Sequence, residues 1–555
     1  GTENTLIGGL AGDALTDADF NVAVGAGALG KDTLGSRSTA LGYLALFDQN
    51  FTSATNSNNT AVGYGAGQNV TTGIQNTLIG SLAGDALTDA DFNVAVGVNS
   101  LSTDTLGSRS TAIGRSALKN QNFTSATDAY NVAVGFGAGE SVTTGLRNTI
   151  MGGLAGDALT NGNNNVVLGY NSLGSDTQGN NSVAVGQGTL QAQNFTSSTD
   201  VYNVAVGHQA GNQVTTGVNN TLIGGLAGDA LTTGSSNTSV GKSALGGVTE
   251  GSQNSALGHG ALLSVTTSSN NTAMGYLAGN LITTGSQNTV IGSLAGDALT
   301  DADLNVALGY AALGGDTLGS RSVAIGHGAL SNQNFTSATN SNNTAVGFSA
   351  GESVTTGTQN TLIGSAAGDE MTTGTANTFI GSTAAGTGVV TGDSNTAVGK
   401  SAALNLTSGS NNLFLGHDAG VTGSPGGNIT TASNTMVLGD ENIANAHIQV
   451  ALTVASDERD KTDFTDLDVG LDFVKQLKPY TYKWDKRSKY GDNTADDYDL
   501  NAQTPDGTHK EDWLDVGFKA QDVEALEQAA GYDKANKTNL SITISEDGKQ
   551  YGMQY

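Results

Sequence analysis

Cysteine is absent from this sequence of 555 residues, which excludes disulfides, thiolate metal sites and cysteine nucleophiles. Proline occurs only 3 times and aromatic residues make up 5% of the chain, so large rings cannot build its core. Charged residues amount to 13%, and their net charge of −28 disfavours nucleic acid and anionic membrane surfaces as partners. No run approaches about 18 uninterrupted apolar residues, which excludes a membrane-spanning helix.

Glycine is abundant instead, with 80 residues, and hydrophobic residues reach 37%. Because the hydrophobic residues recur at fixed intervals, the composition does not indicate disorder. Glycine never settles into the three-residue period that collagen requires. The chain starts at Gly1 rather than at methionine, and we therefore expect a segment before it.

A motif of the type Asn-Thr-Ala-Val-Gly recurs along the first four-fifths of the chain. Its first terminal glycines are Gly8, Gly25, Gly42, Gly63, Gly80, Gly97, Gly114, Gly135 and Gly152, and the series continues to Gly416. Most spacings are 17 residues and four are 21, so the pattern returns every 72 residues. A repeat of this length indicates one small structural unit stacked many times.

Each repeat has the features of one coil of a parallel β-solenoid or β-roll. β-branched and aliphatic residues precede the glycine, as in residues 60–62 and 94–96, and turn-forming residues surround them. Seventeen residues are too few for a helix–turn–helix repeat, and no 3.6-residue period appears. A coil buries its apolar side chains only when its neighbours cover them. We therefore predict an all-β shaft of stacked coils over residues 1–440.

Stacking aligns equivalent residues of successive coils in columns. Asparagine stands four residues before the glycine in most repeats, as at Asn59 and Asn76, and predicts a ladder in which each amide bonds the next. Small residues such as Ala66 and Ala83 follow the glycine and suit the close approach of three chains. The pattern resembles the head repeats of trimeric autotransporter adhesins. That resemblance implies β-rolls packed around a threefold axis, hence a homotrimer.

The 21-residue repeats carry inserts that contain Gln-Asn-Phe-Thr-Ser. Their phenylalanines, at equivalent places, are Phe51, Phe123, Phe195 and Phe335. These rings either contact a receptor or close their own loops. Aromatic residues directly after the motif glycine are further candidates for contact with a receptor sugar: Tyr43, Tyr64, Phe136, Tyr170, Tyr276, Tyr310 and Phe348.

Aspartates recur once per super-repeat, at Asp13, Asp85, Asp157, Asp229, Asp297 and Asp369. They either cap turns and add solubility or bind Ca²⁺. Because adjacent coils lack matching aspartates, we predict no metal site and no cofactor. The histidines are dispersed without metal-ligand spacing, and no carboxylate pair stands out for glycan cleavage. The shaft is therefore not predicted to be an enzyme.

The last hundred residues have a different character. Residues 456–555 hold 13 Lys+Arg and 22 Asp+Glu, which is 35 of the chain's 72 charges, together with both tryptophans. Apolar spacing over 469–477 predicts an amphipathic helix, followed by a strand over 480–484. A second helix is predicted over 520–530. We therefore predict a small α+β domain over 456–555, joined to the shaft by a neck over 441–455.

The sequence Ser-Asp-Glu-Arg-Asp-Lys-Thr at 456–462 resembles the opening of the intramolecular chaperone domain of endosialidase tailspikes and many phage tail fibres. Blocks at 470–482 and 517–524 follow in the family's order. The resemblance implies that Ser456 is the nucleophile and Lys461 the base of a dyad that cuts the bond between Ala455 and Ser456. It also implies further residues after Tyr555.

Asp460 stands where that family has an apolar residue beside the lysine. A neighbouring carboxylate favours the charged form of a lysine, which is not the form that accepts a proton. We therefore expect Asp460 to slow the cleavage.

Together these features predict a structural and host-binding component of a phage tail fibre, located in the virion and folded by its own chaperone. Its partners would be two further copies of the chain, other tail proteins, and a glycan or protein receptor on the host surface. Two alternatives stay open: a trimeric adhesin on a bacterial surface, and a tailspike that degrades polysaccharide.

Overall fold

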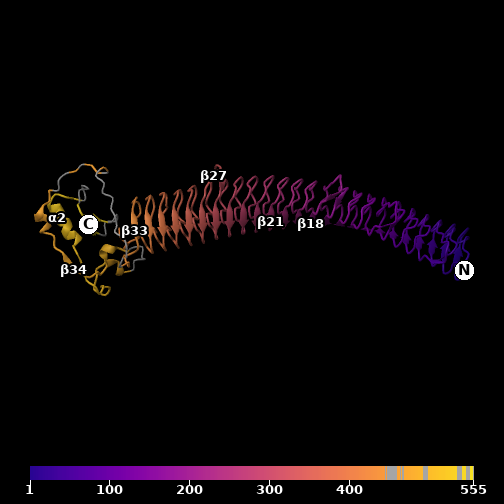
Figure 1. Cartoon of the computed structure of the whole chain (residues 1–555), viewed down its shortest axis with the longest axis horizontal. Helices are drawn as coiled ribbons and strands as arrows, with labels where there is room; N and C mark the ends of the chain where they lie inside the picture. The colour runs from indigo at the N-terminus through magenta and orange to yellow at the C-terminus, as the bar shows by residue number, and fades with distance from the viewer. Residues whose placement is uncertain are drawn as a thin grey trace. The chain divides into compact units, whose positions relative to one another are not determined.

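The structure, a computed structural model, describes residues 1–443, 446, 459, 461–462, 464, 468–491, 498–533, 540–544 and 551–553. The chain divides into two compact units, Gly1–Asn305 and Val306–Tyr555. Strands predominate in both (Figure 1). Within the described residues, no helix is long and apolar enough to cross a bilayer.

The first unit is a parallel β-solenoid in which each coil contributes one three-residue strand to a long sheet (Figure 1). These strands are β1 (Thr5–Ile7), β2 (Val22–Val24), β4 (Thr39–Leu41), β6 (Thr60–Val62), β7 (Thr77–Ile79), β8 (Val94–Val96), β10 (Thr111–Ile113), β12 (Val132–Val134), β13 (Thr149–Met151), β14 (Val166–Leu168), β16 (Val183–Val185), β18 (Val204–Val206), β19 (Thr221–Ile223), β20 (Thr238–Val240), β21 (Ser255–Leu257), β22 (Thr272–Met274) and β23 (Thr289–Ile291). Equivalent residues pair, as Leu78 with Ala95, which confirms the predicted stacking of coils.

The second unit begins with the same architecture. Its solenoid strands are β24 (Val306–Leu308), β26 (Val323–Ile325), β28 (Thr344–Val346), β29 (Thr361–Ile363), β30 (Thr378–Ile380), β31 (Thr396–Val398), β32 (Leu413–Leu415) and β33 (Met436–Leu438). Each 21-residue repeat adds a second, two-residue strand pair at its insert. These pairs are β3 (Gly35–Ser36) with β5 (Thr55–Asn56), β9 (Gly107–Ser108) with β11 (Thr127–Asp128), β15 (Gly179–Asn180) with β17 (Thr199–Asp200), and β25 (Gly319–Ser320) with β27 (Thr339–Asn340).

The motif glycine is required by its backbone conformation and by the distance between coils. Gly80 has a φ of 137°, a region that side chains rarely adopt, and a Cβ on it would lie 2.5 Å from the carbonyl oxygen of Gly97. Adjacent coils therefore meet backbone to backbone at this corner, which explains why every repeat ends its strand in glycine.

Side chains alternate across each strand, so only the middle residue of the three points into the coil. Leu78 and Ala95, both middle residues, are fully buried. The small residues after the motif glycine are also inside, since Ala66 and Ala83 have no exposed surface. Our expectation that these alanines would let three chains approach closely is therefore wrong, because their neighbours in the same chain already cover them.

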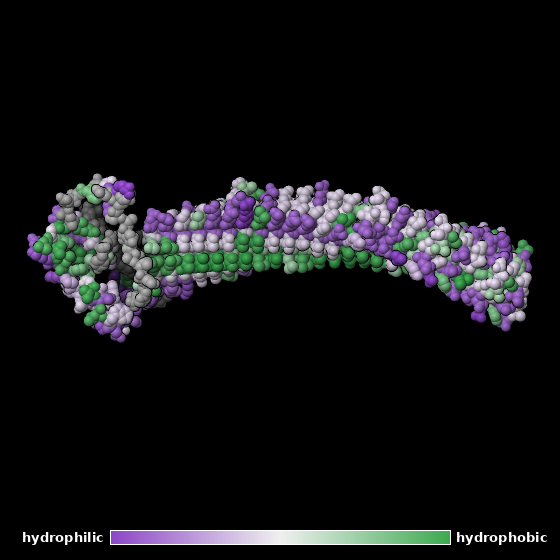
Figure 2. Space-filling view, in the orientation of Figure 1, coloured by the Kyte–Doolittle hydropathy of each residue, from purple (hydrophilic) through white to green (hydrophobic). Residues whose placement is uncertain are grey.

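The third residue of each solenoid strand points outward and is aliphatic or methionine in every coil. We call this column the apolar row. Its members that are more than a third exposed are Ile7, Leu41, Ile79, Ile113, Met151, Ile223, Leu257 and Met274 in the first unit, and Leu308, Ile363, Leu415 and Leu438 in the second. Figure 2 shows such hydrophobic side chains in green, aligned across successive coils. A contiguous exposed row of this kind is typical of an interaction surface.

The asparagine column forms a buried ladder, in which many coils have the predicted amide–amide bond, as Asn412 with Asn395 at 3.0 Å, and in which bonds to the backbone are added. The Asn76 Oδ1 atom accepts from the backbone N–H of Asn93 at 3.0 Å, and its Nδ2 atom donates to the carbonyl of Ala90 at 2.8 Å. An amide–amide contact to Asn59 is longer, at 3.4 Å. Each side chain thus satisfies backbone groups where one coil meets the next, because those buried groups would otherwise lack partners.

We expect Asn76→Ala to leave the Asn93 N–H and the Ala90 carbonyl without partners in a buried place. Unsatisfied buried groups of this kind cost about 2–4 kcal/mol together. Stacked repeats open locally, so hydrogen exchange of amides in the coils around Asn76 is the measurement. Asn76→Asp keeps the acceptor but puts a buried carboxylate opposite the Ala90 carbonyl, so it should raise exchange as well. An unchanged exchange pattern in Asn76→Ala would contradict the role of the ladder.

The described C-terminal residues form a small α+β region. Its elements are α1 (Leu471–Val474), β34 (Tyr480–Tyr482), η2 (Arg487–Lys489), η3 (Leu500–Ala502), β35 (Asp515–Gly517), α2 (Ala520–Ala529), β36 (Ile542–Ile544) and β37 (Tyr551–Met553). β34 pairs antiparallel with β35, and β36 pairs antiparallel with β37. The second predicted helix is confirmed, whereas the first is limited to a single turn that ends at Val474, before Pro479.

Candidate functional site

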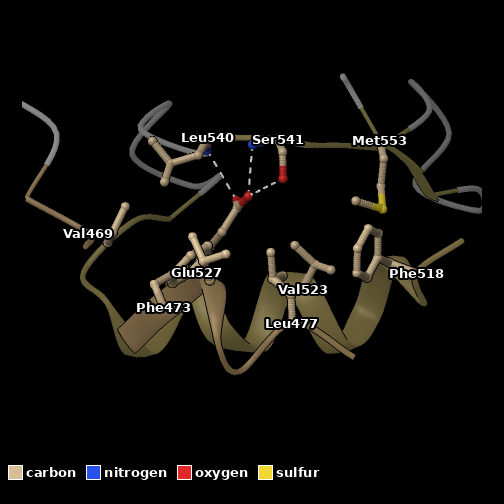
Figure 3. A pocket seen from close by; sticks show the side chains of 10 residues that line it. Val469, Phe473, Leu477, Phe518, Val523, Glu527, Leu540, Ser541 and Met553 are labelled. Atoms are coloured by element: carbon tan, nitrogen blue, oxygen red, sulfur yellow. Dashed lines mark hydrogen bonds between the residues drawn. The ribbon is translucent and has the colours of Figure 1, made fainter. Parts of the chain in front are cut away.

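The C-terminal region encloses an apolar pocket of about 300 Å³ (Figure 3). Phe473 in α1 and Leu477 just after it line one side. Val523 in α2, Phe518 and Met553 also line the pocket, and Phe518 lies beside Met553 (Figure 3). The pocket therefore lies between the sequence blocks at 470–482 and 517–524, which carry part of the family resemblance. Its apolar lining is a small hydrophobic core for the C-terminal region.

One carboxylate lies among these apolar side chains. Glu527 is only 1% exposed. It accepts hydrogen bonds from the backbone N–H groups of Leu540 at 3.1 Å and Ser541 at 2.8 Å, and from the Ser541 hydroxyl at 2.5 Å (Figure 3). Three donors on one buried carboxylate compensate its loss of hydration. Glu527 thus anchors the residues before β36 on α2.

The surface of the region is unusually apolar for so charged a sequence. Leu471 is 66% exposed, Leu514 65% and Val516 74%. Trp513 is 47% exposed. Exposed apolar side chains of this size are typical of interaction surfaces.

Of the predicted dyad, Lys461 is described and its side chain is exposed. Ser456, Ala455 and Asp460 lie outside the described residues. The pairing of Ser456 with Lys461 therefore stays a prediction that rests on the sequence.

The four insert phenylalanines are placed inside their inserts. Phe51 and Phe335 are 5% exposed, Phe123 is 6% and Phe195 is 8%. Rings buried to this degree close the loop that carries them, and contact with a receptor would require the insert to open. As receptor contacts these residues stay a prediction.

Sequence reasoning missed a buried acid beneath each insert. Asp104 is fully buried, and its Oδ1 atom accepts from the backbone N–H groups of Gly107 at 3.0 Å and Phe123 at 3.1 Å. Its Oδ2 atom accepts from Gln121, whose own oxygen accepts from Asn131 at 2.9 Å. Burial raises the pKa of Asp104. The signal was available, because Asp-Thr-x-Gly stands 17 residues before the insert glutamine in all four copies: Asp32, Asp104, Asp176 and Asp316.

The aromatic residues after the motif glycine are exposed, in contrast to the insert phenylalanines. Their exposed fractions run from 50% for Tyr43 to 59% for Phe348. Some stack on the equivalent residue of the next coil, as Tyr43 on Tyr64 with ring centroids 5.5 Å apart. Others stack on histidine, as Tyr310 on His327 at 5.1 Å. Exposed rings on a rigid scaffold are suited to binding.

The aspartates that we considered for Ca²⁺ lie at the turns, where all except Asp13 are half-buried. Within the part of the chain that the structure describes, no group of three or more His, Asp or Glu residues is placed to hold a metal ion. The Oδ1 atoms of Asp85, Asp157 and Asp369 are buried without a hydrogen-bond partner. Burial raises the pKa of Asp85 to about 6. The ionised form of these carboxyl groups is therefore destabilised, because burial removes water without supplying a hydrogen-bond donor to the Oδ1 atom.

We expect Asp85→Asn to stabilise its coil near pH 7.5 and to have a smaller effect at pH 4. Because the pKa of Asp85 is raised in the folded chain, the folded state binds the proton more tightly, and stability falls as the pH rises from about 3.8 to about 6. The measurement is hydrogen exchange at the Asn69 amide, which donates to the Asp85 carbonyl at 3.1 Å. A stabilisation of the same size at both pH values would contradict this explanation.

In comparison with known protein families, the C-terminal region matches one family. Residues 456–532 match the family described as chaperone of endosialidase. The match begins at Ser456 and covers α1, β34, β35 and α2. No curated protein and no solved structure matches the chain. The chain therefore carries a β-solenoid followed by a segment similar to the endosialidase chaperone.

Proposed function

We propose that the chain is a structural and host-binding component of a phage tail fibre, folded and trimerised by its C-terminal chaperone region. The observation that carries the proposal is the family match at 456–532 placed directly after a repetitive solenoid. Long parallel pairing is slow to form and exposes strand edges to mispairing, so a shaft of this kind benefits from an assembly factor in the same chain.

The apolar row supports association of identical chains. It lies on the sheet side of each coil, and its members Ile79 and Ile113 are both 38% exposed. Because every coil contributes one such residue, a second and third copy in the same register would cover the row along its length. A threefold arrangement brings three rows to one axis and removes their surface from water. The exposed Leu514 and Val516 give the chaperone region its own surface for the same partners.

Self-cleavage at the bond between Ala455 and Ser456 belongs to the proposal. The Ser456 hydroxyl would attack the Ala455 carbonyl carbon while the neutral Lys461 amine accepts its proton. The proton then passes to the departing Ser456 nitrogen as the peptide bond breaks, and water hydrolyses the resulting ester. Losing the chaperone after assembly makes refolding impossible, which turns equilibrium stability into kinetic stability.

Native mass spectrometry of the full chain, together with denaturing gels, tests the proposal. We expect a trimer under native conditions and a fragment of residues 1–455 on the gel. A stable monomer or dimer would contradict the assembly role. As a tail fibre, the trimer would reside in the virion, contact other tail proteins at one end and bind a glycan or protein of the host surface.

A further inference from the structure

One column of exposed side chains contains a gap between two aromatic rings. The residues that directly follow the motif glycine in successive coils are Arg115, Phe136, Gly153 and Tyr170. Their coils are adjacent, because β10 pairs with β12, β12 with β13 and β13 with β14. Phe136 is 53% exposed and Tyr170 57%. Gly153 has no side chain, so this column has no side chain between the two rings.

The surroundings of Gly153 show that this position is open. A Cβ built on it would meet a single atom within 4 Å, the Tyr170 Cδ2 at 3.7 Å. The φ angle of Gly153 is not positive, so its backbone conformation is open to residues other than glycine. Other coils place tyrosine, phenylalanine or histidine at the same point. The gap is therefore a property of this residue and not of the fold.

Phe136 has a cationic neighbour in the preceding coil, and Tyr170 carries a hydroxyl group. The Arg115 guanidinium lies 5.6 Å from the Phe136 ring centroid, on the side of the preceding coil. Phe136 thus turns its remaining face toward Gly153. The Tyr170 hydroxyl adds one hydrogen-bond donor and acceptor beside the gap.

The distance between the two rings limits the thickness of a ligand that can contact both of them. Two coil steps separate the backbone positions that carry the rings by about 9.6 Å, at the usual spacing of neighbouring strands. Contacts of about 3.5–4.0 Å on each face leave about 2 Å for the thickness of the guest. A flat aromatic ring would not touch both faces. A puckered saturated ring fills this thickness and directs C–H groups at the negative faces of the aromatic rings.

We propose that this gap binds one pyranose ring of a neutral glycan between Phe136 and Tyr170. The inference rests on the proposed host-binding function and specifies its ligand. The net charge of −28 disfavours a polyanionic glycan, since long-range repulsion opposes its approach. The combination of apolar faces with a few polar groups is typical of a site that fixes both the position and the orientation of a small ligand.

The test uses the full chain and saturation-transfer difference NMR with three probes. Maltohexaose and cellohexaose are the neutral probes, and sialyllactose is the anionic one. We expect saturation of the ring C–H protons of a neutral oligosaccharide and at least a tenfold loss of affinity in Gly153→Tyr, which fills the gap. Phe136→Ala combined with Tyr170→Ala removes both faces and should cause a similar loss.

Gly225→Tyr is the matched control. Gly225 follows the motif glycine in another coil, and a Cβ on it meets only the His208 carbonyl oxygen, at 4.0 Å. Its neighbours in the column are His208 and Lys242, so it offers no pair of aromatic carbon rings. This variant should bind as the wild type does.

Three results of the NMR experiment would overturn the proposal: no transfer to either neutral probe, wild-type binding by Gly153→Tyr, or stronger transfer to sialyllactose than to the neutral probes. A change in the native mass of Gly153→Tyr would instead assign the gap to a second copy of the chain, and would also overturn it. Native mass and cleavage, measured on the same samples, report on assembly independently of glycan binding.

Discussion

Ser456→Ala and Lys461→Ala should remain full length on denaturing gels and still assemble into trimers, whereas the wild type should yield a fragment of residues 1–455. The first substitution removes the hydroxyl that attacks the peptide bond, and the second removes the base that accepts its proton. A bond at this position lies after the last solenoid strand, β33, and before α1. Its cleavage would leave both folds intact.

The expected effect is a loss of cleavage of several orders of magnitude, since a serine hydroxyl is a weak nucleophile without a base. Asp460 supplies a test in the opposite direction. Asp460→Leu removes a carboxylate that favours the charged form of Lys461, and cleavage should become faster. The two sets of variants therefore bracket the wild type.

The interpretation would be wrong if wild type and Asp460→Leu both stayed intact as assembled trimers. The C-terminal region would then act as a permanent cap on the trimer. If Ser456→Ala were cut as the wild type is, an external protease would be responsible for the fragment.

Placing two charges in the apolar row should abolish the trimer. Ile79→Asp combined with Ile113→Asp puts two carboxylates per chain on a surface that the proposed assembly buries. Burying carboxylates without partners costs several kcal/mol each, and three chains would bring six of them together. Native mass spectrometry should therefore show monomers where the wild type forms trimers.

The coils themselves should tolerate this change, because both side chains point outward and are 38% exposed. Circular dichroism checks that the β signal is retained. Leu281→Asp is the matched control, since Leu281 is 48% exposed and stands outside the apolar row. A trimer that survives the double substitution, or that Leu281→Asp also disrupts, would show that the row is not the interface.

Much of the shaft followed from periodicity. The 17-residue spacing of the motif glycines located the strands, because each repeat can bury its apolar residues only by stacking on an equivalent one. The glycine itself reports a contact between coils, as at Gly80. The helix at Ala520–Ala529 was likewise predicted from the sequence. Such features depend on interactions within one repeat or between identical neighbours, which the sequence displays many times.

Other features depend on the path of the chain in three dimensions. The pattern of residues could not tell whether the alanines at Ala66 and Ala83 faced the coil or a partner, since both places favour small side chains. The inserts could not be oriented either, because the burial of Phe123 depends on Asp104, which lies in the preceding coil.

The sequence by itself thus determined the repeat, the strands, the candidate dyad at Ser456 and Lys461, and the resemblance of the C-terminal region to a chaperone. Only the tertiary structure decided which columns are buried, that the apolar row is exposed, and that Phe136 and Tyr170 border an open position at Gly153. The physical reason is that a period specifies which residues align, whereas the turns between strands decide which way each aligned column points.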